Sequence, residues 1–214
     1  MISSRSVVQD LQVTQLNDPE GVTWTEAQLI SALNQALRML QLLRPDATAK
    51  HASVNAQEGV RQTIPIDGVS LIRVVCNIRS NGARGQVIRL VQKEDLDSAS
   101  GSWMQATGLL VKEYMYDSRI PKQFFIYPAV TVDKQIEIEY SARADTVTSA
   151  AFDNDLPVDA IYAQPLQELM MYKLLSGDAT NGSNGAEHLQ IAMELLGVKD
   201  EQAAKLSAAR KGGN

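Results

Sequence analysis

The stretch YMYDSRIPKQFFIYPAVTVDKQIEIEYSA, from Tyr114 to Ala142, decides the fold that we predict for this chain. It holds the densest run of aromatic residues in the sequence. The segment FFIY lies between Pro121 and Pro128, and prolines at both ends are typical of a short strand. We therefore place a β-strand here and expect its aromatic side chains to fill a hydrophobic core.

The second half of this stretch has a clean two-residue alternation. After a turn near residues 133–134, the sequence IEIEYS at 136–141 alternates apolar and polar side chains. This pattern is typical of a half-buried antiparallel strand. We expect its apolar side in the core and Glu137, Glu139 and Ser141 in water.

The period of two extends upstream to about His51. The predicted strands there are Val60–Pro65, Leu71–Ile78, 86–91 and Leu109–Asp117, with a hairpin loop at Ser80–Gly85. Leu71–Ile78 is apolar on both faces, which predicts a central strand. Five or six strands joined by short connections favour antiparallel pairing in a sandwich or small barrel.

Both ends of the chain have a helical period. Thr25 and Gln28 form a capping box, and the leucines that follow recur at helical spacing until Pro45. A weaker helix is expected over Ser3–Leu16, capped by Ser3 or Ser4. The other predicted helices begin near Asp159, with Pro165 in the first turns, and at a cap on Asn184, with Gly197 as the stop.

These patterns predict an α+β protein in which a bundle of N-terminal and C-terminal helices packs with an antiparallel β-sandwich or small β-barrel domain. We expect N-terminal helices over 1–50 and the β domain over 51–145. Helices over 146–197 would complete the bundle, and 198–214 would form a C-terminal tail.

The bulk composition excludes several classes of protein. Of 214 residues, 44% are hydrophobic, enough for a packed core, and the net charge of −5 disfavours general nucleic-acid binding. Cys76 is the single cysteine and lies in an apolar run, where a buried inert thiol is expected. No run is long enough to span a bilayer and the N-terminus lacks a signal-type apolar segment, so we expect no membrane insertion.

Charge is unevenly distributed along the chain. The segment 57–93 has six basic and two acidic residues, whereas 145–194 has eight acidic residues and Lys173 as its single lysine or arginine. Such runs are most often solvated faces of separate elements. A nucleic-acid module that uses the arginines between Arg61 and Lys93 is one functional alternative.

The search for catalytic chemistry finds no constellation, and we predict no enzyme activity, no metal and no cofactor. His51 and His188 are far apart, without metal-ligand neighbours at typical spacing. Glu137 and Glu139 share a strand face and suggest a glycosidase-type pair, although exposure would leave both carboxylates unperturbed. The glycines at 82 and 85 join two strands, which excludes a phosphate-binding loop.

Several short segments, taken in order, resemble the tailed-bacteriophage head-to-tail adaptor (connector) proteins. The similar segments are Trp24-Thr25 with Asn34-Gln35-Ala36, Arg44-Pro45-Asp46, Glu58–Pro65, Arg73–Asn77, the run from Tyr116-Asp117 to Tyr127-Pro128, Ile136–Tyr140 and Ala186-Glu187-His188. The resemblance covers about Thr23–Gly197.

This resemblance implies a structural virion protein made in the host cytoplasm. It implies a ring, usually of twelve copies, between the portal protein and the tail tube or nozzle, through which DNA passes during ejection without specific binding. The implied portal-binding segment is the C-terminal tail, with Lys199, Lys205, Leu206, Arg210 and Lys211. As residues lining the DNA channel, where like charge repels DNA, we propose Asp153, Asp155, Asp159 and Glu168. A virion-associated cell-wall hydrolase with Glu137 or Glu139 as the acid is a further alternative.

Overall fold

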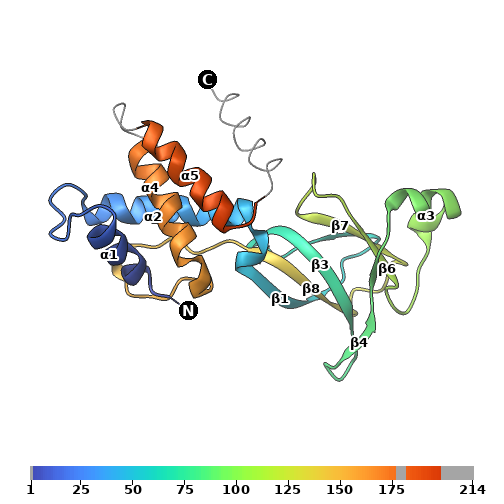
Figure 1. The fold of residues 1–214 in the computed structure, drawn as a ribbon. Coiled ribbons are helices and arrows are strands. Elements are labelled where there is room, and N and C mark those ends of the chain that lie inside the picture. Colours follow the sequence, from blue (N-terminus) through green and yellow to red (C-terminus); the bar gives the residue numbers. More distant parts are fainter. Residues whose placement is uncertain (1, 177–181, 199–214) are drawn as a thin grey trace. The chain divides into compact units, whose positions relative to one another are not determined.

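The structure is a computed structural model that describes residues 2–176 and 182–198 (Figure 1). The chain divides into two compact units. The helical unit contains residues 1–47 and 144–214, within the described limits, and the β unit contains residues 48–143. The β unit is thus inserted between the N-terminal and C-terminal parts of the helical unit.

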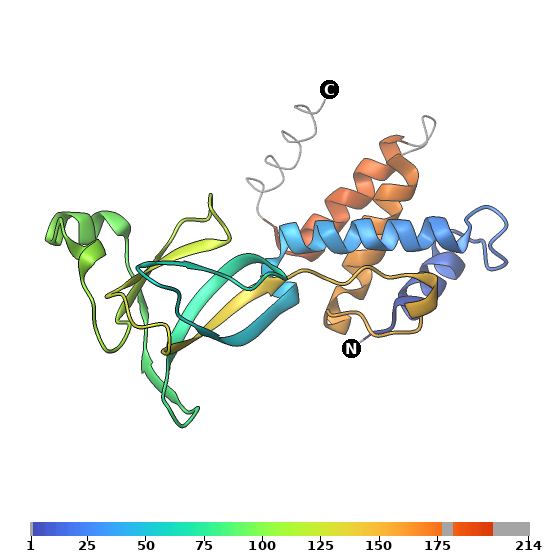
Figure 2. The same ribbon diagram turned by 180° about the vertical axis from the view of Figure 1, so that it is seen from behind.

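The helical unit is built on four helices, α1 (Ser4–Thr14), α2 (Glu26–Leu43), α4 (Ala163–Ser176) and α5 (Gly182–Leu195). The predicted caps of the first two are confirmed: Ser3 accepts from the Ser6 amide, and the capping box of Thr25 and Gln28 is complete. Figure 2 shows α2 crossing α4, on which it packs. The leucine stripe of α2 is buried in this contact, which gives the unit its core.

Asp18 holds the loop between α1 and α2. Its carboxylate accepts hydrogen bonds from the backbone amides of Val22, Thr23 and Trp24 at 2.8–2.9 Å. These bonds lower the pKa of Asp18 from its ordinary value, and the bond from the Trp24 amide has the largest effect. One buried side chain therefore fixes this loop.

The C-terminal helices begin and end at identifiable signals. Asp159 caps a short 3-10 turn that leads into α4, and Pro165 lies in the first turn of α4, as expected. Asn184 was expected as the cap of α5, but that helix already begins at Gly182. Gly197 has φ +63 and its amide donates to Glu194, while Val198 donates to Met193, which is a Schellman ending.

The β unit contains two four-stranded sheets in the described residues. Its strands are β1 (Ala49–Asn55), β2 (Arg61–Thr63), β3 (Gly68–Ile78), β4 (Arg84–Val87), β5 (Arg89–Leu90), β6 (Glu113–Tyr116), β7 (Gln123–Tyr127) and β8 (Gln135–Ala142). The first sheet has the order β1-β8-β3-β4 and the second β2-β7-β6-β5. The sheets remain open and do not close into a barrel, so the α+β prediction is confirmed in its sandwich form.

The core of the β unit lies between the two sheets. Ile136, Ile138 and Tyr140 of β8 pack with Phe124 and Ile126 of β7. Neighbours on the same face of a strand are two residues apart, so the alternation seen in the sequence placed these side chains correctly. The other face of β7 carries Phe125 and Tyr127, which meet Trp103 edge to face. The aromatic run therefore fills two clusters, one on each face of β7.

Three details of the β prediction are wrong. Eight strands are present instead of five or six, because β1 has few β-branched residues and β5 is only two residues long. The pair β5–β6 is parallel, since α3 (Lys93–Ala99) and a 3-10 turn intervene between these strands. Finally, the polar face of β8 was expected in water, but Glu137 and Ser141 on this face are buried.

Candidate functional site

The outer face of the β1-β8-β3-β4 sheet carries the most concentrated group of charged side chains in the β unit. Glu137 and Glu139 of β8 lie on this face, opposite the core. We expected both carboxylates in water, but Glu137 is only 6% exposed. The reason is that residues of the neighbouring strands cover it, which a sequence pattern along one strand does not reveal.

Arg84 is the main partner of Glu137. It extends from β4 across β3, and its Nε lies 2.7 Å from Glu137 Oε2. Cys76 also donates its thiol to this carboxylate at 3.4 Å. The hydrogen bond from Arg84 lowers the pKa of Glu137, while burial raises the pKa of the Cys76 thiol. A general acid needs a raised pKa, so this geometry does not support the hydrolase alternative.

Glu139 forms the second ion pair of this charged face. Arg73 is the register partner of Glu139 on the neighbouring strand β3, and its Nε donates a hydrogen bond to the Glu139 carboxylate. On the side of β1, both carboxylates face His51, whose Nδ1 is 3.7 Å from Glu137 and whose Nε2 is 4.0 Å from Glu139. The face is thus an ion-pair network of two arginines and two glutamates, with a half-exposed histidine at its β1 border.

The basic segment 57–93 does not form a free cationic surface. Four of its six basic residues form ion pairs with carboxylates of the same unit: Arg73 with Glu139, Arg84 with Glu137, Arg89 with Glu113 and Lys93 with Asp97. Arg61 lies over the Phe125 ring. Binding of nucleic acid needs cations available to phosphates, so these pairs argue against a DNA-binding module.

A cavity of about 710 Å³ lies in the β unit and is lined in part by Lys93 and Glu94 of α3. Arg61 and Phe125 line it from the sheet, and Lys93 and Arg119 from its rim. Two of these three cations are already paired, since Lys93 bonds Asp97 and Arg119 bonds Asp117. The residues that line the cavity include no histidine and no cysteine.

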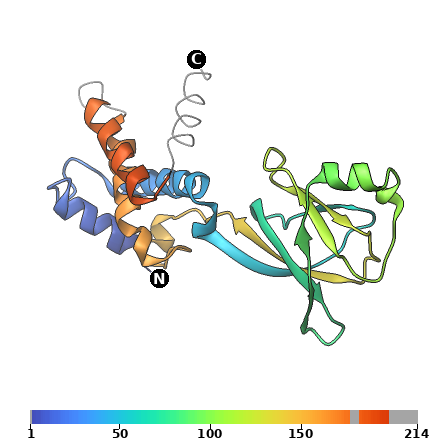
Figure 3. The ribbon, with the colours of Figure 1, turned by 45° about the vertical axis from the view of Figure 1, so that its right-hand side comes forward.

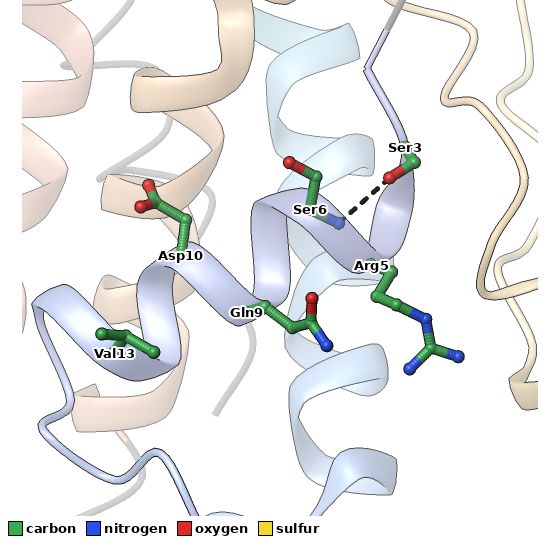
Figure 4. A pocket seen from close by; sticks show the side chains of 6 residues that line it. All are labelled: Ser3, Arg5, Ser6, Gln9, Asp10 and Val13. Carbon is green, nitrogen blue, oxygen red and sulfur yellow. Dashed lines mark hydrogen bonds between the residues drawn. The ribbon is translucent and has the colours of Figure 1, made fainter.

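A second hollow of about 440 Å³ runs along α1 in the helical unit (Figure 4). Its six lining residues are Ser3, Arg5, Ser6, Gln9, Asp10 and Val13. All of them come from α1 and its cap, so the hollow is the outer surface of one helix. Arg5 and Asp10 are each engaged elsewhere, with Asp153 and Gln167.

The proposed channel residues occupy different environments in the helical unit. Asp155 and Asp159 are exposed, Asp159 as a cap, and the exposed Asp153 pairs with Arg5. Glu168 is 7% exposed and lies 2.6 Å from His188 Nδ1, inside the packing of α4 on α5. A buried carboxylate does not repel DNA in a channel, so the predicted role does not fit Glu168 and is compatible with the three exposed aspartates.

Metal binding finds no support in the described ranges 2–176 and 182–198, where no group of three potential ligands occurs. His51 belongs to the β unit and His188 to the helical unit. None of the helices described is long and apolar enough to cross a membrane. The five tail residues proposed for portal binding (Lys199, Lys205, Leu206, Arg210 and Lys211) lie outside the described residues.

Fold and site together define an α+β protein with two four-stranded sheets, in which the outer face of one sheet carries a network of ion pairs. The protein family described as SU10 adaptor protein matches residues 5–211, nearly the whole chain. The chain therefore belongs to this family of phage head-to-tail adaptors and is a virion component. A comparison with curated proteins finds no significant match.

Proposed function

We propose that the protein forms a ring, of twelve copies, that joins the portal to the tail and encloses part of the DNA channel. The observation that carries this proposal is the family match across residues 5–211, because the adaptor family implies association with portal and tail proteins. Such adaptors are typically not enzymes. The paired Glu137 is consistent with a structural role for the charged face.

The negative charge of the helical unit supports the proposal that this unit lines the DNA channel. Its described residues contain twelve acidic and four basic side chains, whereas the β unit contains ten acidic and twelve basic ones. We propose that Asp153, Asp155 and Asp159 face the lumen, where their charge keeps DNA from adhering. An assembled ring with these three carboxylates on its outer wall would contradict this part of the proposal.

The mass of the assembly tests the proposal most directly. The purified protein is measured by native mass spectrometry, alone and with the portal protein of the same phage. We expect a closed ring with a defined number of copies, at least when portal is present. A monomer under both conditions would refute the ring, and a ring that does not bind portal would refute the adaptor position.

A further inference from the structure

The first sheet of the β unit has two open edges, and we propose that β4 of one copy pairs with β1 of the next copy, so that the sheet continues from subunit to subunit. This inference rests on the ring proposed above and names the contact that builds it. It follows from the state of the two edges, from strand direction and from charge.

The β1 edge is long and regular. All seven residues of β1 pair with β8 in unbroken register, whereas the β3–β8 pair has three register shifts. Alternate residues of a strand direct their N–H and C=O groups to opposite sides, so about half of those of β1 face away from β8. No strand of the described residues pairs with that side.

The usual protection of an edge strand is weak on β1. Proteins block such edges with bulges, prolines or projecting charges. β1 has no bulge and no proline, and its side chains include Ala49, Ala52 and Ser53. Its lysine, Lys50, forms an ion pair with Asp67, with 3.4 Å between Nζ and Oδ2. The edge can therefore accept another strand without steric obstruction from its own side chains.

The β4 edge lies in a hairpin that a neighbour can reach. Figure 1 and Figure 3 show the β3–β4 hairpin projecting from the rest of the β unit. Its loop, residues 79–83, is exposed, and Val87 of β4 is 67% exposed. No described strand pairs with β4 on the side away from β3.

Strand direction makes β4 a suitable partner for β1. Each pair in the order β1-β8-β3-β4 is antiparallel, so β4 runs opposite to β1. A β4 strand placed beside β1 of a neighbouring copy therefore continues the antiparallel alternation. The contact joins two different edges, and a head-to-tail contact of this kind forms a ring when the rotation from copy to copy closes, whereas pairing of β1 with β1 ends at a dimer.

The charged face favours the same arrangement. Within one copy, Arg84 extends from β4 across one strand to reach Glu137 on β8. From a neighbouring β4 beside β1, an arginine would again be one strand away from the carboxylates of β8. On that side the ring nitrogens of His51 lie 3.7 Å from Glu137 and 4.0 Å from Glu139. Each of these carboxylates already pairs with one arginine of its own copy, so an incoming arginine would share them with Arg73 and Arg84.

Cysteine cross-linking tests this contact in the full-length chain. Cys76→Ser gives a background without thiols and keeps a donor to Glu137. Val87→Cys on β4 is combined in turn with Ala49→Cys, Ser53→Cys or Asn55→Cys, which share the outer face of the sheet. After assembly with portal and mild oxidation, at least one combination should give a ladder of disulfide-linked multimers, because paired strands lie within disulfide distance.

The controls separate this contact from its alternatives. Ser53→Cys with Met104→Cys, an exposed position in the turn after α3, should stay monomeric on denaturing gels. Two single variants, Val87→Cys and the responsive β1 cysteine, should give dimers when mixed and none alone. Dimers from a β1 cysteine alone would overturn the proposal in favour of β1–β1 pairing.

The outcomes also separate this inference from the proposed function. Rings of the expected mass without any cross-link at the three β1 positions would refute strand pairing and leave the adaptor ring standing. The absence of a ring by native mass spectrometry would refute the proposed function, and this contact with it.

Discussion

Glu137 illustrates how single residues of this protein depend on neighbours that are distant in sequence. Its alternation with Ile136 and Ile138 gives the correct face of β8, yet the carboxylate is buried because Arg84, 53 residues away, lies on it. Arg84 itself is largely in solvent. The pair is therefore a partly screened interaction whose contribution to stability is moderate.

We predict that Glu137→Gln lowers the free energy of unfolding by about 1–2 kcal/mol, because a charged hydrogen-bonded partner is lost within a partly screened pair. The matched variant Glu139→Gln should cost less, since the Glu139 side chain is more exposed, and Glu137 accepts from the Cys76 thiol in addition to its arginine. Urea unfolding of both variants at neutral pH measures the difference. Equal losses would show that burial of Glu137 does not matter.

The pH dependence of this pair has a definite sign. Arg84 lowers the pKa of Glu137 in the folded state, so the stabilisation is present above the ordinary glutamate pKa of about 4.3 and is lost as pH falls through the lower folded value. The stability difference between the natural chain and Glu137→Gln should therefore narrow on acidification below about pH 4.3. A gap that stays constant into this acid range would contradict the role of Arg84.

At the scale of elements, α2 shows that local signals determine some parts of the structure completely. Its start at Glu26, the Thr25 cap and its end before Pro45 all follow from the sequence. The same approach placed the start of α5 three residues late, since a cap at Asn184 predicts a helix from residue 185, although Gly197 at its end was correct. Strong reciprocal caps are reliable, whereas a lone asparagine after a loop is not.

Loss of the α2 cap should be measurable. Thr25→Ala removes the acceptor for the Gln28 amide and should lower the free energy of unfolding by about 1 kcal/mol. Thr23→Ala is the matched control, because only its backbone amide is engaged, by Asp18, and a change within about 0.5 kcal/mol is expected. Thermal or urea unfolding compares the two. A Thr25 variant as stable as the control would show that the capping box contributes nothing measurable to the free energy of unfolding.

At the scale of the whole molecule, the inserted β unit and the helical unit differ in their charge. Its charges are largely paired among themselves, whereas the described helical unit has three times as many acidic as basic residues. The C-terminal tail that follows α5 carries the opposite sign, with four basic residues and two acidic ones in 199–214. This contrast motivates the proposal that the tail binds the portal.

Truncation after Gly197 tests the tail. We expect the shortened chain to retain its helical and β cores, since Leu196 is the last buried core residue within the described ranges, and to lose at least tenfold in portal affinity. Circular dichroism checks the fold, and calorimetric titration with portal measures binding. Replacement of Lys199, Lys205, Arg210 and Lys211 by glutamine in the full-length chain separates charge from length. Unchanged affinity of the truncated chain would exclude the tail as the anchor.

The sequence alone determined the α+β class, the two capped N-terminal helices and the core face of β8, because these depend on local periodicity and on hydrogen bonds between near neighbours. It also carried the resemblance that the family match bears out. The tertiary structure decided the strand order, the parallel β5–β6 pair, and the burial of Glu137 and Glu168. These features depend on partners far apart along the chain, such as Arg84 for Glu137, and no spacing within one segment encodes them.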